Sequence, residues 1–273
     1  MGGDRLAAKL AVARQLDSGE PRRHAHSKQS VRTAVSISAT PRGQAPGQTT
    51  ADRCCARNEH KLDAVIRPLV LAKNFRSFAD LAAAYDKGAD YLITRVPRPG
   101  STVGIIAPHG GRIEAHTSEI ATAIAGADFS LYVLEGIRST GNYAALHLTS
   151  HYFDEPSCLE LLATCDDVVA IHGCKVDGEV VLVGGLDDEL AAELGAAMTK
   201  AGLVCYPDGH EFPGTHPHNI CNRGRRGVGV QLELSAAFRE SSAHKRKLVA
   251  PVRAVLLRRA VRRTRPGAAK PSV

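Results

Sequence analysis

A histidine and a glutamate follow the apolar run around Ile105 at a spacing suited to a metal ion. His109 comes directly after this run and Pro108, and Glu114 lies five positions further on. Two glycines after His109 let the backbone turn sharply, so Glu114 can return toward the histidine ring. A histidine and a carboxylate that converge at a strand end can both bind zinc. The local sequence alone favours a simpler interpretation, in which the histidine is exposed in a turn and the glutamate caps the next helix.

A second apolar strand ends in the same way. The segment 167–174 runs from Asp167 through four apolar residues to His172, Gly173 and Cys174. With His109 and Glu114, His172 would complete a set of two histidines and one carboxylate. Such a set leaves the fourth tetrahedral position open, as catalytic zinc requires. Cys174 is a competing ligand, although a small buried thiol is the more common role for such a cysteine.

A third strand is predicted over 228–234, where apolar and polar residues alternate. The alternation places Gln231 and Glu233 on one face. A half-exposed strand with a solvated glutamate is the usual meaning of this pattern. The functional alternative makes Glu233 a general base that takes a proton from the attacking water and passes it to the leaving amine.

A polar loop precedes this strand and carries the groups best suited to hold an anionic substrate. It spans 207–227 and contains His210, His216, His218, Asn219, Asn222, Arg223, Arg225 and Arg226. An arginine can bind a carboxylate through two parallel hydrogen bonds. A solvated charge cluster is the alternative interpretation of three arginines within four positions.

Alternating helices and strands would position these residues. Strands are expected over 91–94, 103–107, 131–134, 168–171, 180–183 and 228–234, and helices over 78–87, 118–125, 156–163, 188–201 and 248–263. Ser77, Thr117, Asp154 and Asp187 are the expected caps, and Pro251 should fall in the first turn of the last helix. This order predicts an α/β domain with an open mixed, mostly parallel sheet and helices on both faces. In such sheets the reactive groups gather at the carboxyl ends of the strands.

The basic charge of the chain lies at its two ends. The whole chain carries a net charge of +7, divided as +5 over 1–60, −8 over 61–238 and +10 over 239–273. We expect 1–60 to form a disordered basic extension, 61–265 the folded domain and 266–273 a disordered tail. Because the folded part is acidic, nucleic-acid binding is not expected to be the main function.

The cysteine pattern indicates a reducing compartment, and the hydropathy indicates a chain that does not cross a membrane. None of the seven cysteines forms a C-x-x-C pair, and an odd number does not favour a disulfide framework. No apolar run has the length needed to cross a bilayer. The beginning of the chain lacks the continuous apolar region of a signal peptide, so a cytoplasmic location is expected.

Taken together, the motifs resemble the poly-γ-glutamate hydrolase family of zinc-dependent γ-glutamyl peptidases. The resemblance covers about residues 74–260 and rests on seven strings in register: APHGGRIEAHTSEIA, LEG, LHLTSHYFDEP, AIHGC, VGGLD, NICNRG and GVQLELS. It implies a core similar to that of zinc carboxypeptidases, with the metal at the strand ends. Leu134 stands where an aromatic residue is expected before Glu135.

The resemblance also implies roles for individual residues. One zinc ion per chain would be held by His109, Glu114 and His172, with Glu233 as the catalytic carboxylate. Asn222 and Arg223 are similar to the Asn-Arg pair that holds a substrate carboxylate in zinc carboxypeptidases. In those enzymes the pair precedes the second histidine, whereas here it follows. Alternative contacts for the substrate are Asn219, Arg225 and Arg226.

The sequence therefore predicts a zinc-dependent hydrolase of γ-glutamyl amide bonds, with an anionic γ-glutamyl polymer or peptide as substrate. Two alternatives stay open. One is a zinc amidohydrolase of small N-acyl or γ-glutamyl amino acids, because a fold hosts many related reactions. The other is a non-catalytic protein that associates with nucleic acid through its basic ends.

Overall fold

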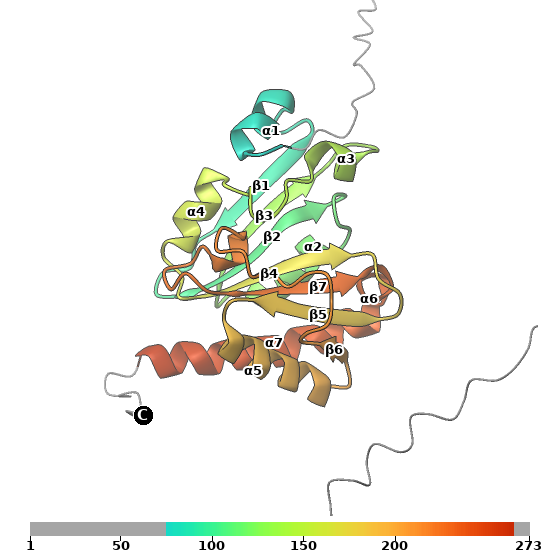
Figure 1. The fold of residues 1–273 in the computed structure, drawn as a ribbon. Coiled ribbons are helices and arrows are strands. Elements are labelled where there is room, and N and C mark those ends of the chain that lie inside the picture. Colours follow the sequence, from blue (N-terminus) through green and yellow to red (C-terminus); the bar gives the residue numbers. More distant parts are fainter. Residues whose placement is uncertain (1–74, 265–273) are drawn as a thin grey trace, which may run out of the picture. The chain divides into compact units, whose positions relative to one another are not determined.

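Seven strands form a single sheet in the order β1-β3-β2-β4-β7-β5-β6 in the computed structural model, which describes residues 75–264 (Figure 1). The strands are β1 (Tyr91–Val96), β2 (Val103–Gly111), β3 (Ser130–Gly136), β4 (Asp167–Cys174), β5 (Val180–Gly185), β6 (Val204–Tyr206) and β7 (Val230–Ser235). Four neighbouring pairs are parallel, and β1/β3 and β5/β7 are antiparallel. This confirms the predicted open mixed, mostly parallel sheet. The predicted extension 1–60, the predicted start of the domain at 61 and the tail 266–273 lie outside the described residues.

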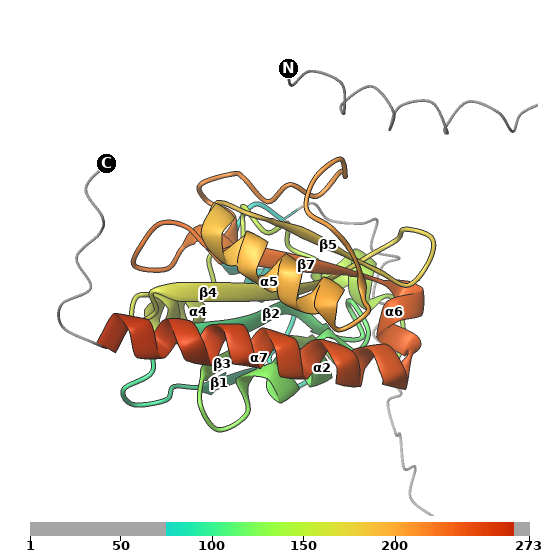
Figure 2. The ribbon, with the colours of Figure 1, turned by 90° about the horizontal axis from the view of Figure 1, so that it is seen from below.

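Helices cover both faces of the sheet. They are α1 (Phe78–Ala84), α2 (Thr117–Ala125), α3 (Asn142–Leu146), α4 (Pro156–Leu162), α5 (Asp188–Lys200), α6 (Ala236–Glu240) and α7 (Ser242–Thr264), with a short 3₁₀ helix, η1, at Ile220–Asn222. One hydrophobic cluster joins the sheet to α2, α5, α6 and α7, and a second joins it to α1, α3, α4 and η1. Figure 2 shows α7 and α5 side by side on the face of the sheet that the first cluster covers. Successive side chains of β2 point to opposite faces of the sheet, so Ile105 packs in the first cluster and Ile106 in the second.

Two of the four predicted N-terminal helix caps are confirmed, and two are wrong. Ser77 and Asp187 cap α1 and α5 by accepting backbone hydrogen bonds of 3.1 Å from the third residue beyond each cap. Thr117, the expected cap of α2, is instead its first residue. Glu155 caps α4 in place of Asp154, whose carboxylate accepts a bond from the backbone of Phe78. Neighbouring polar residues compete for one cap, and tertiary contacts decide between them.

The last helix is longer than predicted. It begins at Ser242, so Pro251 lies inside it and not in the first turn as expected. Its buried residues Leu248, Val252, Val255 and Leu256 pack in the first hydrophobic cluster. This packing stabilises a helix that lacks one internal hydrogen bond at the proline.

Four of the eight lysines and arginines of the last helix form ion pairs within the protein: Arg253, Arg259, Arg262 and Arg263. The side chain of Arg253 donates to the carbonyls of Ile124 and Ala125 and pairs with Asp128. Arg262 pairs with Glu193 at 2.6 Å. These ion pairs neutralise part of the charge of the last helix, whereas Arg246, Lys247 and Arg258 are exposed on it.

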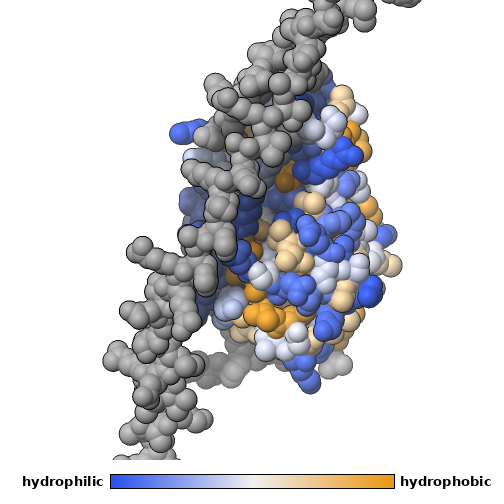
Figure 3. Space-filling model, turned by 90° about the vertical axis from the view of Figure 1, so that its right-hand side faces the viewer, coloured by the Kyte–Doolittle hydropathy of each residue, from blue (hydrophilic) through white to orange (hydrophobic). Residues whose placement is uncertain are grey.

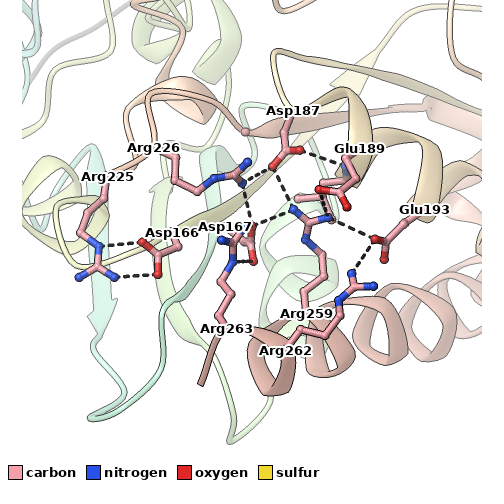
Figure 4. Close-up of polar contacts among 12 residues, drawn as sticks. Asp166, Asp167, Asp187, Glu189, Glu193, Arg225, Arg226, Arg259, Arg262 and Arg263 are labelled. Carbon is pink, nitrogen blue, oxygen red and sulfur yellow. Dashed lines mark hydrogen bonds and ion pairs between the residues drawn. The ribbon is translucent and has the colours of Figure 1, made fainter. Parts of the chain in front are cut away.

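A network of arginines and carboxylates closes the end of the sheet where β4 begins (Figure 4). Its centre is Asp167, whose side chain is fully buried and pairs with Arg226, Arg259 and Arg263 at 3.0, 3.3 and 2.8 Å. Burial raises the pKa of Asp167, but the hydrogen bond from Arg263 and the charges of Arg259 and Arg263 outweigh it, so the pKa lies below its usual range. The network joins β4 to the last helix across almost a hundred residues of sequence.

Replacing Asp167 with asparagine is expected to lower the free energy of unfolding by about 3 kcal/mol at pH 7, because the buried Arg259 and the partly buried Arg226 and Arg263 all lose the same fully buried anion. The depressed pKa fixes the sign of the pH dependence. The carboxylate stabilises the fold above the pKa of the unfolded chain, about 3.9, and this stabilisation is lost as pH falls through the lower folded pKa. Urea unfolding at pH 7 and pH 3 should show the difference between wild type and variant shrinking in acid.

Asp166 provides a matched control on the adjacent residue. Its carboxylate pairs with Arg225 at 2.7 Å, where the arginine side chain is about half exposed. An exposed pair contributes only about 0 to 1 kcal/mol, so Asp166→Asn should change the free energy of unfolding little. Equal losses in the two variants would contradict a special role for the buried carboxylate.

Within residues 75–264, no helix is both long and apolar enough to span a membrane. The large exposed hydrophobic side chains are Leu92, Ile137, Tyr143, Val204, Tyr206, Leu257 and Val261. On the face seen in Figure 3, small hydrophobic groups are set among hydrophilic ones. Scattered exposed apolar side chains of this kind are ordinary for a protein surface.

Candidate metal centre

A β-bulge at the end of β2 sets the direction of His109. Ala107 pairs with Val133 of β3, but Gly110 pairs with Glu135, so β2 uses one residue more than its neighbour over this stretch. The extra residue falls at Pro108-His109. A bulge bends the strand and changes the direction of a side chain. His109 is thereby buried at the sheet edge, with its Nε2 atom 2.8 Å from the carbonyl oxygen of Leu148.

The turn after His109 returns Glu114 to the same place, as the sequence predicted. The backbone N–H of Glu114 donates to the carbonyl of His109 at 2.9 Å, and Glu114 Oε1 lies 3.1 Å from His109 Nδ1. Gly111 makes this turn possible with φ +62°. A Cβ atom there would lie 2.6 Å from the carbonyl oxygen of Gly136. Only glycine combines this φ with so close an approach of two backbones.

His172 and Glu233 lie opposite each other on neighbouring strands. The register of β4 and β7 pairs their Cα atoms, so both side chains lie on the same face of the sheet. His172 Nδ1 is 3.2 Å from His109 Nδ1 and 3.7 Å from Glu114 Oε2, and the backbone N–H of Gly173 donates to Glu114 Oε2 at 2.7 Å. The structure therefore brings the three predicted ligands and the predicted catalytic carboxylate together.

A third histidine joins them. His147 follows α3, and its Nε2 atom lies 3.6 Å from Glu114 Oε1, while its ring centroid is 4.2 Å from that of His109. Ligand atoms of His109, Glu114 and His147 all lie within 4.8 Å of one another, a spacing that permits a metal ion. Glu114 is thus surrounded by three imidazoles, and either His147 or His172 can supply the second nitrogen ligand.

The donor set fits zinc. Zinc–nitrogen bonds of about 2.0 to 2.1 Å place two ligand atoms of a tetrahedron about 3.3 Å apart. The distances from His109 Nδ1 to His172 Nδ1 and to Glu114 Oε1 are 3.2 and 3.1 Å. The Leu148 carbonyl accepts a hydrogen bond from the Nε2–H group of His109, which leaves the Nδ1 lone pair free to bind the ion. His172 Nε2 is buried without a hydrogen-bond partner among the described residues.

The two carboxylates differ in protonation. Burial opposes the charge of Glu114, but His109 and hydrogen bonds from the surrounding histidines hold its pKa well below the usual range. Burial raises the pKa of Glu233 to about 7, and the negative charge of Glu114 adds to this, while His172 and His147 act in the opposite direction. Glu114 is therefore a permanent anion suited to a cation, and Glu233 can gain or lose a proton near neutral pH.

A short chain of amides orients Glu233. Gln231, two positions earlier on the same face of β7, donates from Nε2 to Glu233 Oε1 at 3.3 Å and to the carbonyl of Phe212 at 3.1 Å. Its Oε1 accepts a bond of 2.9 Å from Asn219 Nδ2. Asn219 thus supports Gln231 and holds the polar loop against β7.

A cavity of about 390 Å³ opens beside this cluster. It is lined by His109, Glu114, Tyr143, His147, Thr149, Ser150, His151, His172, Gly173, Glu211, Phe212, Pro213, Gly214, Thr215, His216, Asn219, Gln231 and Glu233. Its volume is within the range of small-molecule sites. A substrate bond placed here would face the three imidazoles and both carboxylates.

Of the predicted substrate contacts, Asn222 and Arg223 lie outside this cavity, whereas the alternative contact Asn219 lines it. The Asn222 amide donates to the carbonyls of Gly214 and His216, and its oxygen accepts from the backbone of Leu186 and Gly229. These bonds give Asn222 a structural role in the loop and do not favour a contact with substrate. Arg223 is exposed and is not part of the cavity lining.

Two alternative contacts, Arg225 and Arg226, lie at the opposite end of the strands, where β4 begins. They pair with Asp166, Asp167 and Asp187. Asp167 precedes His172 by five strand positions, about 16 Å at 3.3 Å per residue. These arginines are therefore not available to a substrate at the metal cluster.

Comparison with known proteins agrees with this arrangement. A family model described as poly-gamma-glutamate hydrolase matches residues 75–250. The chain belongs to the poly-gamma-glutamate hydrolase family. Among its relatives in Bacillus subtilis (strain 168), YndL is 35% identical over 169 residues and YmaC is 37% identical over 172 residues. The matched segments cover 61% and 62% of this chain, and 66% and 70% of the length of the relatives.

Two solved structures are similar in fold to this poly-gamma-glutamate hydrolase family member. The structure of a bacteriophage poly-gamma-glutamate hydrolase is 30% identical with a TM-score of 0.64, and covers 68% of this chain and 97% of its own. The zinc-free form of YndL is 31% identical with a TM-score of 0.59, and covers 70% and 98%.

Two features of the site were not assigned from the sequence. His147 is one of them, because no strand or turn pattern around it indicates proximity to His109. Tyr143, whose ring stacks on His147 with centroids 4.5 Å apart, carries no sequence signal at all. The motif LHLTSHYFDEP, which contains His147 and follows Tyr143, contributes to the family resemblance, but it does not predict that this segment lies beside His109.

Proposed function

We propose that the chain is a zinc-dependent hydrolase of γ-glutamyl amide bonds and that poly-γ-glutamate is its substrate. The observation that carries the proposal is the convergence of His109, His172, His147 and the anionic Glu114 on one open cavity, with Glu233 on the same sheet face. Family membership supports the substrate class, and the zinc-free form described for YndL supports zinc as the metal.

His109, Glu114 and His172 would hold the ion. Zinc bound there lowers the pKa of water and polarises a carbonyl oxygen. Leu148 keeps the His109 ring in one orientation through its carbonyl, and the backbone N–H of Gly173 does the same for Glu114. These supporting bonds arrange the ligands before any substrate arrives.

Glu233 would act as the general base and then as the general acid. Its raised pKa means that it can accept a proton from the attacking water at neutral pH and donate it to the leaving amine. Burial lowers the pKa of His147, and nearby His109 adds to this effect, so its ring is neutral at pH 7. A neutral imidazole N–H can donate to the amide oxygen as negative charge develops there.

Metal removal tests this proposal. The purified full chain should contain about one zinc per chain, a stoichiometry typical of sites with three protein ligands. A chelator should abolish the release of short oligomers from poly-γ-glutamate, and added zinc should restore it. Elemental analysis and chromatography of the products give the two readouts.

Three other outcomes decide between the proposal and its alternatives. Cleavage confined to small N-acyl or γ-glutamyl amino acids would favour the smaller amidohydrolase. Full activity without metal would contradict the zinc centre. Binding of DNA without hydrolysis of any γ-glutamyl amide would favour the non-catalytic alternative.

A further inference from the structure

We propose that a second cavity beside the metal cluster, here called the basic cavity, binds the free carboxylates of γ-glutamyl residues on one side of the scissile bond through Arg112 and Lys175. This inference rests on the proposed function and assigns the residues that select a polymeric substrate.

The basic cavity adjoins the cavity at the metal cluster. Its volume is about 400 Å³, and it is lined by Arg112, Ile113, Glu114, Ala115, His116, Tyr143, Gly173, Cys174, Lys175, Phe212, Ala236, Arg239 and Glu240. The two cavities share Glu114, Tyr143, Gly173 and Phe212. A chain whose reacting amide lies at Glu114 can therefore extend past Tyr143 into the basic cavity.

The charges of the two cavities differ. Three cationic side chains, Arg112, Lys175 and Arg239, line the basic cavity, together with the carboxylates of Glu114 and Glu240. The lining of the cavity at the metal cluster contains no lysine or arginine among the described residues, and it includes the exposed acid Glu211. The carboxylates of a polyanionic substrate are therefore attracted to one side of the reacting amide.

Two of the three cations are free to bind a ligand. Arg239 is buried, and its guanidinium donates to the carbonyls of Leu234 and Ala115, so it has a structural role. Arg112 and Lys175 are exposed, and neither pairs with an acidic side chain among the described residues. They combine accessibility with an unneutralised charge at the rim of the basic cavity.

Both free cations are held in place by partners that leave their charge available. One guanidinium nitrogen of Arg112 donates to the carbonyl of Arg138 at 2.9 Å. The ammonium of Lys175 lies 5.6 Å from the centroid of the Tyr143 ring, and that ring stacks on His147. Lys175 is therefore connected to the metal cluster through two stacked rings, which places a cation at the boundary between the cavities.

The arrangement favours oligomers over small amides. In a γ-linked chain every residue carries a free α-carboxylate, so each residue beyond the scissile bond presents one more anion. A small N-acyl amino acid has only the carboxylate next to its amide and no further residue that extends into the basic cavity while the amide lies at Glu114. Arg112 and Lys175 should therefore add affinity that increases with chain length.

The test compares Arg112→Ala, Lys175→Ala and the double variant on γ-linked glutamate oligomers of increasing length. The KM for a hexamer should rise about fivefold in each single variant and about twentyfold in the double variant, because each loses one charge-assisted contact. The KM for γ-glutamyl dipeptides should change less than twofold. Titration calorimetry of the hexamer into the metal-free proteins should show the same losses of affinity, without any turnover.

Two sets of controls accompany these variants. Arg258→Ala and Lys247→Ala remove exposed cations of the last helix that do not line either cavity, and they should leave the KM unchanged. Arg112→Lys with Lys175→Arg keeps both charges and should retain most of the affinity. Circular dichroism verifies that every variant is folded, and high salt should reduce the difference between the hexamer and the dipeptide in the wild type.

Unchanged hexamer affinity in the folded double variant overturns the inference and leaves the proposed function intact. Equal losses for the hexamer and the dipeptide overturn it as well, because they would indicate a general structural effect. If the zinc-loaded wild type hydrolyses no γ-glutamyl substrate of any length, the proposed function itself fails.

Discussion

Replacing Glu233 with glutamine is expected to lower kcat for γ-glutamyl hydrolysis about a thousandfold while the zinc content stays the same. Glutamine keeps the size of the side chain and its contact with Gln231, but it cannot accept a proton. General acid–base catalysis contributes about 10² to 10⁴ in rate, and Glu233 would act in both directions. Kinetics on metal-quantified protein measure the effect.

Glu211→Gln is the matched control, because Glu211 is an exposed glutamate that lines the same cavity. It should leave kcat within about twofold of wild type, as surface changes away from the reacting atoms usually do. Wild-type activity should fall as the pH drops and Glu233 becomes protonated, at or below pH 7 because a bound cation lowers the pKa from about 7. A Glu233→Gln variant with near wild-type turnover would show that another group removes the proton.

The sheet and the site were predictable where local pattern and topology agree. The apolar strands around Ile105 and Ile171 and the rule that reactive groups gather at strand ends were enough to expect His109 and His172 at one edge. Strand register then brings His172 opposite Glu233, which the alternation along β7 had placed on one face. The residue pattern offered the roles of ligand and base as one of two interpretations, and the family resemblance favours these roles, which are proposals.

Contacts between distant segments decided the rest. Asn222 resembled a substrate ligand, yet its amide binds backbone groups of three separate segments. Arg226 resembled a carboxylate clamp and binds Asp167 and Asp187 of its own chain. A polar side chain in a loop has the same local sequence signature in either role, and only its partners in space distinguish the two.

The last helix shows the same limit for secondary structure. Residues 242–247 lack an apolar face, so periodicity placed the start of the helix near Leu248 and Pro251 in its first turn. The Ser241 hydroxyl accepts a hydrogen bond of 3.3 Å from the backbone N–H of His244, and the His244 ring lies 5.3 Å from that of Phe238 in the preceding helix, so the helix begins at Ser242. Tertiary packing outweighs local propensity where the apolar residues lie only on later turns.

Replacing His172 with alanine is expected to lower zinc affinity by a factor of more than about a hundred and to abolish hydrolysis. The Nδ1 atoms of His172 and His109 are 3.2 Å apart, close to the ligand spacing of tetrahedral zinc, and loss of one of three ligands leaves a weak site. His147→Ala is the matched comparison. His147 is the more exposed ring, with 23% of its side chain accessible against 2% for His172.

If His147 donates to the reacting oxygen and does not bind the ion, its alanine variant should retain zinc and lose about a hundredfold in kcat, the usual effect of removing one such donor. Competition with a chromophoric chelator measures zinc affinity in both variants, and single-turnover kinetics measure the chemical step. The opposite pattern, in which His147→Ala loses zinc and His172→Ala keeps it, would assign the ion to His109, Glu114 and His147, whose ligand atoms also lie within 4.8 Å of one another. His172 would then be the neighbour of Glu233 that stabilises its anionic form, because its charge lowers the pKa of that carboxyl.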